Sequence, residues 1–194
     1  MKMMLGRKVI SWIARFSMTA ILFLISIHAN DARCENFPIK PDFIVSGRDL
    51  LIKTPSGNRQ KISFDHEISL SDITLESLTF GEYADIKILD TEGASQRFYK
   101  VYLYRQYEGI YVYSKGLSDV PCLRIDGRKK ELVGACFHES ACENWTERYK
   151  VSNLGKLSIV ERAGTYCDPA GQTYMYVDKF KSGKRISSVV KPIN

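Results

Sequence analysis

Short runs in which apolar and polar residues alternate follow one another along most of the chain, and turn-forming residues separate them. The clearest run is YADIKILD at residues 83–90, whose period of two is typical of a half-buried β-strand. PSGN at residues 55–58 and KSGK at residues 181–184 are strong turn signals. These patterns predict strands at residues 42–46, 49–54, 59–64, 83–90, 95–105, 110–114, 122–126, 131–138, 145–151, 157–162, 173–180 and 185–190.

Hardly any segment has the length and period of an α-helix. Residues 68–78 (ISLSDITLESL) permit either a short helix or an irregular loop. The chain is therefore predicted to be all-β, an antiparallel meander of hairpins. Because open sheet edges invite aggregation, we expect the meander to close into a barrel or a propeller-like sheet.

Residues 1–32 have the features of a secretory signal peptide and are left out of the fold prediction. Four basic residues accompany an apolar stretch at residues 17–27 that is short for a membrane span. Cleavage is expected after Ala29 or Ala32. The alternative is an uncleaved signal anchor, which would be the chain's only contact with a membrane. Residues 33–194 are then expected to form a single all-β domain, periplasmic or secreted.

The formal charge of +6 overstates the basic character of the exported part. Without the four basic residues and the one acidic residue of 1–32, 24 Lys and Arg stand against 21 Asp and Glu, a net charge of +3. The one tight basic run, RKK at residues 128–130, falls at a predicted turn. Nucleic-acid binding needs a clustered basic stripe, so no nucleic-acid partner is predicted.

All five cysteines lie at or after Cys34, and in an exported chain they are expected to form disulfides. Cys122 and Cys136 flank the turn IDGRKK, and Cys142 and Cys167 flank the turn SNLGK. Both pairs are therefore predicted to be cross-strand disulfides that staple antiparallel hairpins. A bond between Cys136 and Cys142 is the main alternative. Cys34 is left over, as a free thiol, as part of a leader, or as a link between molecules.

Candidate catalytic chemistry is sparse. His66 and His138, the only histidines after residue 32, lie in different segments, whereas a zinc site needs three or four ligands. The chain has no G-x-S-x-G, no glycine-rich phosphate loop and no H-E-x-x-H. Its many acidic residues offer glycosidase-like carboxylate pairs only by chance. We therefore predict no enzyme activity, no catalytic residue, no metal and no cofactor.

Residues 137–145 are the best candidate for a binding loop, because disulfides at both ends would keep it rigid and limit the entropy lost on binding. The loop ends at Trp145, the only tryptophan after residue 32, and tryptophan is enriched at interface hot spots. The alternative is that Trp145 begins a strand and points into the core. The predicted partner-binding residues are Phe137, His138, Glu139, Ser140, Glu143, Asn144 and Trp145, with Arg148 at the edge.

Tyrosine and phenylalanine are concentrated between residues 98 and 113. Such a stripe can form an aromatic platform for sugars. Strands also select tyrosine for cross-strand packing, and this second interpretation is favoured.

Three segments resemble bacterial periplasmic inhibitors of lysozyme-like peptidoglycan hydrolases. That group includes i-type lysozyme inhibitors and immunity proteins against secreted lysozyme-like effectors. The segments are YADIKILD at 83–90 with the tyrosine-rich strand after it, LSDVPCLRIDGRKKELVGAC at 117–136, and TERYKVSNLGKLSIVE at 146–161. They cover about half of the exported chain.

Two departures from these inhibitors matter. Residues 77–82 (SLTFGE) lack the oxygen ligands of a calcium-type loop that members often have at this place, so no calcium is predicted. Ser140 matches the serine of a Ser-Gly loop in some inhibitors, but Glu143 stands at the position of the tyrosine that enters the lysozyme cleft. The identity of the inserting residue is therefore open.

The resemblance implies an exported protein that binds a lysozyme-like hydrolase and inhibits it, or gives immunity to it, by inserting residues 137–145 in its cleft. Such a cleft contains an acidic pair. Hydroxyl groups, an aromatic anchor and a nearby basic residue can plug it and offset its charge. The alternative is an envelope module for carbohydrate or peptidoglycan binding, or for assembly, which would use the tyrosine face instead.

Overall fold

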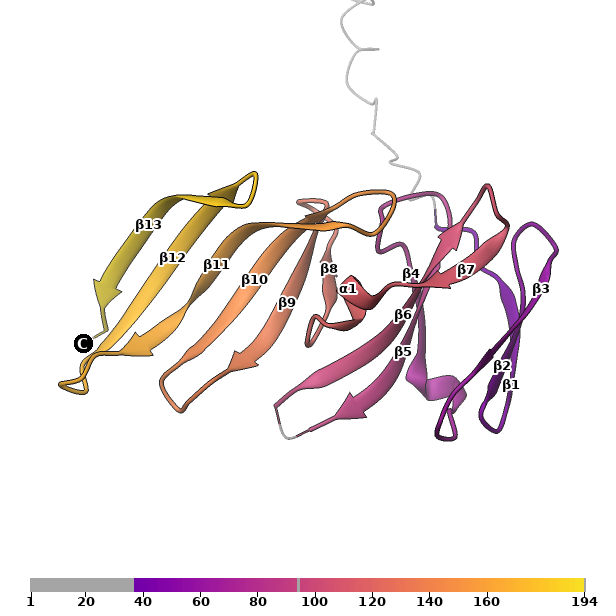
Figure 1. Ribbon diagram of the computed structural model, residues 1–194, viewed down its shortest axis with the longest axis horizontal. Helices are drawn as coiled ribbons and strands as arrows, with labels where there is room; N and C mark the ends of the chain where they lie inside the picture. The colour runs from indigo at the N-terminus through magenta and orange to yellow at the C-terminus, as the bar shows by residue number, and fades with distance from the viewer. Residues whose placement is uncertain (1–36, 94, 194) are drawn as a thin grey trace, which may run out of the picture. The chain divides into compact units, whose positions relative to one another are not determined.

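The structure is a computed structural model, and it describes residues 37–93 and 95–193. The predicted signal peptide and Cys34 lie outside the described residues. The described residues belong to one compact unit, which contains three antiparallel β-sheets (Figure 1). The all-β, antiparallel class predicted from the sequence is confirmed. In this described part, no helix has the length and apolar character needed to cross a membrane.

The first sheet contains β1 (Asp42–Ser46), β2 (Asp49–Lys53) and β3 (Arg59–Ser63), paired in chain order. Tight turns join the strands because Gly47 and Gly57 adopt φ angles of 61° and 88°, which glycine tolerates without a steric penalty. Leu50 and Ile52 of β2 and Ile62 of β3 are buried while the residues between them point away, as a strand with one covered face requires.

The second sheet has the order β4 (Ile73–Glu76), β5 (Asp85–Glu92), β6 (Arg97–Arg105) and β7 (Ile110–Tyr113). The segment 68–78, for which the sequence permitted a helix or a loop, forms a short 3-10 turn, η1 (Leu70–Asp72), and then β4. Asp72 favours this turn because its carboxylate accepts a hydrogen bond of 2.7 Å from the Ser69 N–H.

The aromatic stripe between residues 98 and 113 is used mainly for packing between strands. The rings of Tyr102 and Tyr113 lie 5.6 Å apart across β6 and β7, and those of Tyr104 and Tyr111 lie 5.2 Å apart. Tyr111 is buried, and its hydroxyl donates a hydrogen bond to a backbone carbonyl. These contacts agree with the packing interpretation of the stripe rather than with a sugar platform.

The third sheet follows a short helix, α1 (Lys115–Ser118), and its strands pair in chain order. They are β8 (Arg124–Asp126), β9 (Glu131–His138), β10 (Asn144–Val151), β11 (Leu157–Cys167), β12 (Thr173–Lys181) and β13 (Lys184–Pro192). β11 is longer than predicted because its last residues pair with β10 on one side and with β12 on the other.

Two hydrophobic cores use opposite faces of the second sheet. Along β6, Val101 and Leu103 belong to one core, while the alternating Tyr102 and Tyr104 pack against the other. The first core joins this sheet to β2 and β3, and the second joins it to β9, β10 and β11. The third sheet is thus anchored through its β8–β11 part, which positions the loop between β9 and β10.

The expected closure into a barrel or a propeller is not confirmed. Among the described strands, β8 and β13 are the two edges of the third sheet, and no ladder joins them. The edge strand β13 carries Lys184, Lys191 and Pro192, and lysine or proline on an edge hinders pairing with another strand. The residue types on β13 therefore oppose edge-to-edge pairing. The alternating pattern of the sequence fits such an open, protected edge as well as it fits a closed barrel.

Candidate functional site

The loop between β9 and β10, here called the candidate loop, is a tight turn with an exposed tip. The Glu139 N–H donates a hydrogen bond of 2.9 Å to the Glu143 carbonyl, and the Glu143 N–H donates one of 3.0 Å to Ser140 Oγ. His138, Glu139 and Ser140 are exposed, whereas Glu143 is half-buried. The turn therefore presents polar groups from a backbone that its own hydrogen bonds hold.

Two disulfides fix this loop. Cys122 is bonded to Cys136 with their Cα atoms 6.0 Å apart, and Cys142 is bonded to Cys167 with a Cα separation of 5.8 Å. Cys142 stands opposite Cys167 in continuation of the β10–β11 register. The predicted pairing is confirmed, and the alternative bond between Cys136 and Cys142 is excluded.

Hydrogen bonds attach the loop to neighbouring strands. Thr165 Oγ1 on β11 donates to the Cys142 carbonyl over 2.8 Å, and Gln96 Nε2 donates to the Cys136 carbonyl over 3.1 Å. Asn144 begins β10 and pairs with Thr165 in the ladder. The loop is thus held from two sides, by β11 and by the turn between β5 and β6.

Trp145 lies beside the loop and not at its tip. Its ring stacks on that of Phe137 across β9 and β10, with the centroids 5.5 Å apart and the planes 9° from parallel. Both side chains are half-buried. Gly164 faces Trp145 on β11, and a Cβ atom there would lie 2.2 Å from a backbone oxygen and 2.6 Å from the Trp145 Cβ. Trp145 therefore forms a wall of the site, partly in the packed interior.

Arg148 is not brought together with the other selected residues. It lies an odd number of positions after Trp145 on β10, so its side chain points to the other face of the sheet. Its Nε donates to Glu131 over 2.9 Å, and its guanidinium also pairs with Asp126. Hydrogen bonding to Arg148 lowers the pKa of Asp126. Arg148 thus joins β8, β9 and β10 to one another.

A cavity of about 220 Å³, here called the loop cavity, opens beside the candidate loop. The sequence did not indicate several of its residues, because they come from β11 and β12 and meet the loop only through strand pairing. The half-buried Arg162 side chain lies over the Trp145 ring, 6.0 Å from its centroid. The residues lining the cavity are Glu139, Glu143, Trp145, Arg162, Thr165, Tyr166 and Tyr176.

Tyrosine rings continue from the loop cavity along β11 and β12. Tyr166 stacks on Tyr174 at 5.4 Å with the planes 17° from parallel, and lies 6.2 Å from Tyr176. The spacing of Tyr174 and Tyr176 is the sequence signal for a shared face. Two of these rings, Tyr166 and Tyr176, line the loop cavity beside the candidate loop, which no residue of the stripe at 98–113 does.

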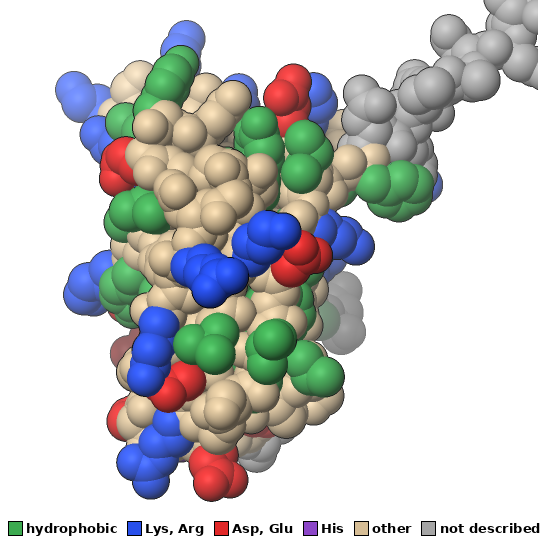
Figure 2. Space-filling model, turned by 90° about the vertical axis from the view of Figure 1, so that its right-hand side faces the viewer, with side chains coloured by type: hydrophobic (Ala, Val, Ile, Leu, Met, Phe, Trp, Pro, Cys, Tyr) green, Lys and Arg blue, Asp and Glu red, His purple; other side chains and the backbone are tan. Residues whose placement is uncertain are grey.

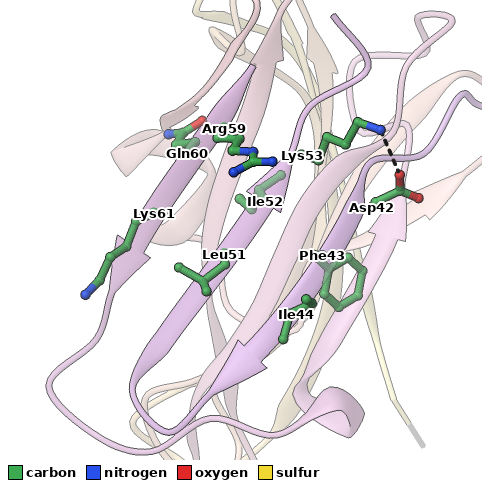
Figure 3. A pocket seen from close by; sticks show the side chains of 9 residues that line it. All are labelled: Asp42, Phe43, Ile44, Leu51, Ile52, Lys53, Arg59, Gln60 and Lys61. Atoms are coloured by element: carbon green, nitrogen blue, oxygen red, sulfur yellow. Dashed lines mark ion pairs between the residues drawn. The ribbon is translucent and has the colours of Figure 1, made fainter. Parts of the chain in front are cut away.

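A second hollow, the outer groove, lies on the first sheet and has a volume of about 530 Å³. Figure 3 shows its apolar side chains, Ile44 and Leu51 among them, with Lys53, Arg59 and Lys61 nearby. Figure 2 shows hydrophobic and basic side chains close together on the side of the molecule where this sheet lies. The sequence did not predict this groove, since it depends on which face of the sheet is left uncovered.

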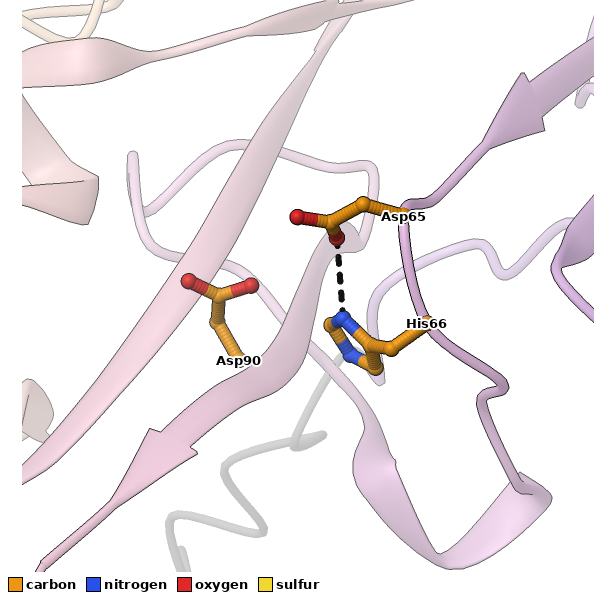
Figure 4. A group of neighbouring side chains, drawn as sticks. All are labelled: Asp65, His66 and Asp90. Atoms are coloured by element: carbon orange, nitrogen blue, oxygen red, sulfur yellow. Dashed lines mark hydrogen bonds and ion pairs between the residues drawn. The ribbon is translucent and has the colours of Figure 1, made fainter.

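Asp65, His66 and Asp90 form a small group whose ligand-type atoms lie close enough to surround a cation (Figure 4). Lys100 already supplies a positive charge there, with its ammonium 2.8 Å from Asp90 and 3.3 Å from Asp65. His66 also pairs with Asp65 at 2.9 Å. The group is therefore described as an ion-pair cluster that ties the segment after β3 to β5 and β6.

No protein-family model and no curated protein sequence matches the chain. Among solved structures, the chain is similar to a Xanthomonas type IV secretion system related protein, with a TM-score of 0.57 and 12% sequence identity. The similarity covers 78% of this chain and 81% of the other. At this identity it shows a shared fold and nothing about activity.

Proposed function

We propose that the protein is an exported binding protein that inhibits a lysozyme-like peptidoglycan hydrolase, or gives immunity to it, through the candidate loop. The observation that carries the proposal is the loop itself, an exposed polar turn held by two disulfides and by hydrogen bonds to β11. A loop that is rigid before binding loses little entropy when it enters a cleft. The sequence resemblance to inhibitors of such hydrolases supports the same assignment.

The tip offers donors that suit the carboxylates of a hydrolase cleft. Within the described part of the chain, Ser140 Oγ only accepts a hydrogen bond, so its hydroxyl hydrogen is free to be donated. His138, two positions before Ser140, is exposed and supplies a ring N–H group. Arg148 is engaged in its own ion pairs, so in this proposal it braces the sheet and does not meet the partner.

The two disulfides, which are expected of an exported protein, support the proposal as well. Disulfides persist in oxidising compartments such as the periplasm, where a lysozyme-like hydrolase would meet its inhibitor. The fold shared with a secretion-system related protein is compatible with a role at the cell envelope. The function needs no enzyme activity, cofactor or metal.

The alternative is an envelope module that binds carbohydrate or peptidoglycan, or assists assembly. The stacked rings of Tyr166 and Tyr174 favour it, since aromatic faces are suited to sugar rings. Binding of the purified protein to peptidoglycan with no hydrolase present would support this function.

The test of the proposed inhibitor is a lysis assay in which the oxidised, exported protein is titrated into several lysozyme types and any muramidase encoded beside it. Stoichiometric loss of lysis is expected for at least one enzyme. Ala141→Trp should abolish it, because Ala141 is exposed at the tip and a bulky ring there blocks insertion. Leu154→Trp, in the exposed turn at the other end of β10, is the matched control. Equal inhibition by both variants would reject the loop as the site.

A further inference from the structure

The loop cavity has aromatic walls and acidic groups at its edge. Trp145, Tyr166 and Tyr176 contribute rings, and Glu139 and Glu143 contribute carboxylates. Four segments of the chain meet here, namely the candidate loop, β10, β11 and β12. With about 220 Å³, the cavity is smaller than the range of roughly 300–1,000 Å³ typical of small-molecule sites, which suits a single side chain.

The charges in the cavity do not balance. Arg162 lies in the wall, but its guanidinium is paired with Glu147 at 2.6 Å. Among the described residues, Glu139 and Glu143 take part in no ion pair, so both carboxylates are available. The pKa of Tyr176 is raised, first by burial; Arg162 lowers it in part, and the carboxylates of Asp178, Glu147 and Glu143 raise it by smaller amounts. The cavity therefore has excess negative charge next to aromatic faces.

We propose that the loop cavity receives one arginine or lysine side chain of the partner protein. A cation over an aromatic face is attracted by the ring, and a carboxylate beside it adds a charge-assisted hydrogen bond. Arginine is the better occupant, because its planar guanidinium stacks on a tyrosine ring while its N–H groups reach a carboxylate in pairs. An anionic group would instead be repelled by Glu139 and Glu143.

This assignment rests on the proposed function and adds to it the chemistry of the partner's contact. The donors at the loop tip would meet the acidic pair of the partner's cleft. The cavity behind these donors would hold a basic side chain from the rim of that cleft. Opposite charges at two neighbouring points fix the register of an interface and reject partners that lack either one.

The proposal that the loop cavity binds a basic side chain can be tested without any hydrolase. The oxidised, exported protein is titrated with capped arginine amide, capped lysine amide and capped citrulline amide, the last being a neutral analogue of arginine. The readout is the fluorescence of Trp145, the only tryptophan after residue 32. We expect saturable binding in the millimolar range for arginine, weaker binding for lysine and none for citrulline.

Glu139→Gln combined with Glu143→Gln should weaken arginine binding about tenfold or more, because two charge-assisted contacts become neutral. Glu67→Gln combined with Glu108→Gln changes the net charge equally at exposed positions on other elements and should bind like the parent. Tyr176→Leu should weaken binding, and Tyr176→Phe should retain it. Equal binding of arginine and citrulline, or an unchanged titration in the Glu139/Glu143 variant, would overturn the proposal.

Failure of the cavity proposal can be distinguished from failure of the proposed inhibitor function. If capped arginine binds but no hydrolase is inhibited, the cavity stands and the proposed function is rejected. If a hydrolase is inhibited equally well by the Glu139/Glu143 variant, the inhibitor stands and the cavity is rejected as its partner contact.

Discussion

The carboxylate of Asp85 accepts a hydrogen bond of 3.0 Å from the backbone N–H of Tyr104, which joins the beginning of β5 to β6. It also accepts one of 3.2 Å from the Thr79 N–H. Asp85 is buried, and this burial raises its pKa to about 6, although the hydrogen bonds from these backbone groups lower it in part. The protein therefore contains an internal acid that binds a proton more readily when folded than when unfolded.

The stability of the protein should depend on this proton. With a folded pKa above the unfolded value, the contribution of Asp85 to the free energy of unfolding rises as the pH falls through about 6. Between pH 7 and pH 5 the expected gain is about 1 kcal/mol. Denaturant unfolding at the two pH values measures it.

Asp85→Asn should lose this gain, because the titrating group is removed. Glu82→Gln changes an exposed neighbouring acid and should keep the gain. A pH dependence that is the same in the parent and in Asp85→Asn would show that another group is responsible.

The bond between Cys142 and Cys167 should be needed both for stability and for binding. Replacing both cysteines by serine opens a loop of 25 residues and should reduce the free energy of unfolding by about 3 kcal/mol. Guanidinium unfolding measures this loss. Inhibition by the variant should also weaken, because the candidate loop is then attached less firmly to β11. A variant that inhibits as strongly as the parent would show that loop rigidity is unimportant.

Gly164 should tolerate no side chain. In Gly164→Ala the added Cβ would meet backbone atoms of β10 at 2.2 Å and 2.8 Å, so the two strands would have to separate. A loss of about 3 kcal/mol in thermal or chemical unfolding is expected. Gly127→Ala is the control, since its Cβ would have no neighbour within 4 Å and its φ angle is not positive.

Arg148 distinguishes a bracing role from a contact with the partner. Arg148→Met leaves the carboxylates of Asp126 and Glu131 without their cation and should cost about 2 kcal/mol of stability. Inhibition measured at a temperature where the variant is fully folded should equal that of the parent. A fully folded variant with weakened inhibition would return Arg148 to the binding surface, as the sequence suggested.

The sequence predicted what depends on neighbours along the chain. Alternation and turn residues gave the strands, and cysteines placed symmetrically about two turns gave the disulfides. The position of the candidate loop followed from both. The loop cavity could not be predicted, because it needs Trp145, Gly164 and Tyr176 to stand opposite one another on three strands. That register is set by packing and by bulges, neither of which alternation reveals.

By contrast, the sequence allows a prediction of which face of the sheet each side chain points to. Trp145 and Arg148 differ by an odd number of positions on one strand, so they point to opposite faces. Closure into a barrel was expected from the general need to protect edges. The structure meets that need with lysine and proline on β13, which an edge-by-edge examination of the sequence could have indicated.

Every residue of β13 is exposed, and none belongs to either hydrophobic core. Its pairing with β12 is therefore held mainly by the backbone, without buried side chains to reinforce it. The free energy needed to open segments of this kind locally is a small fraction of the free energy of global unfolding. Amide deuterium exchange should accordingly advance from the carboxyl end of the chain inward, strand by strand, while the hairpin that carries the candidate loop stays closed.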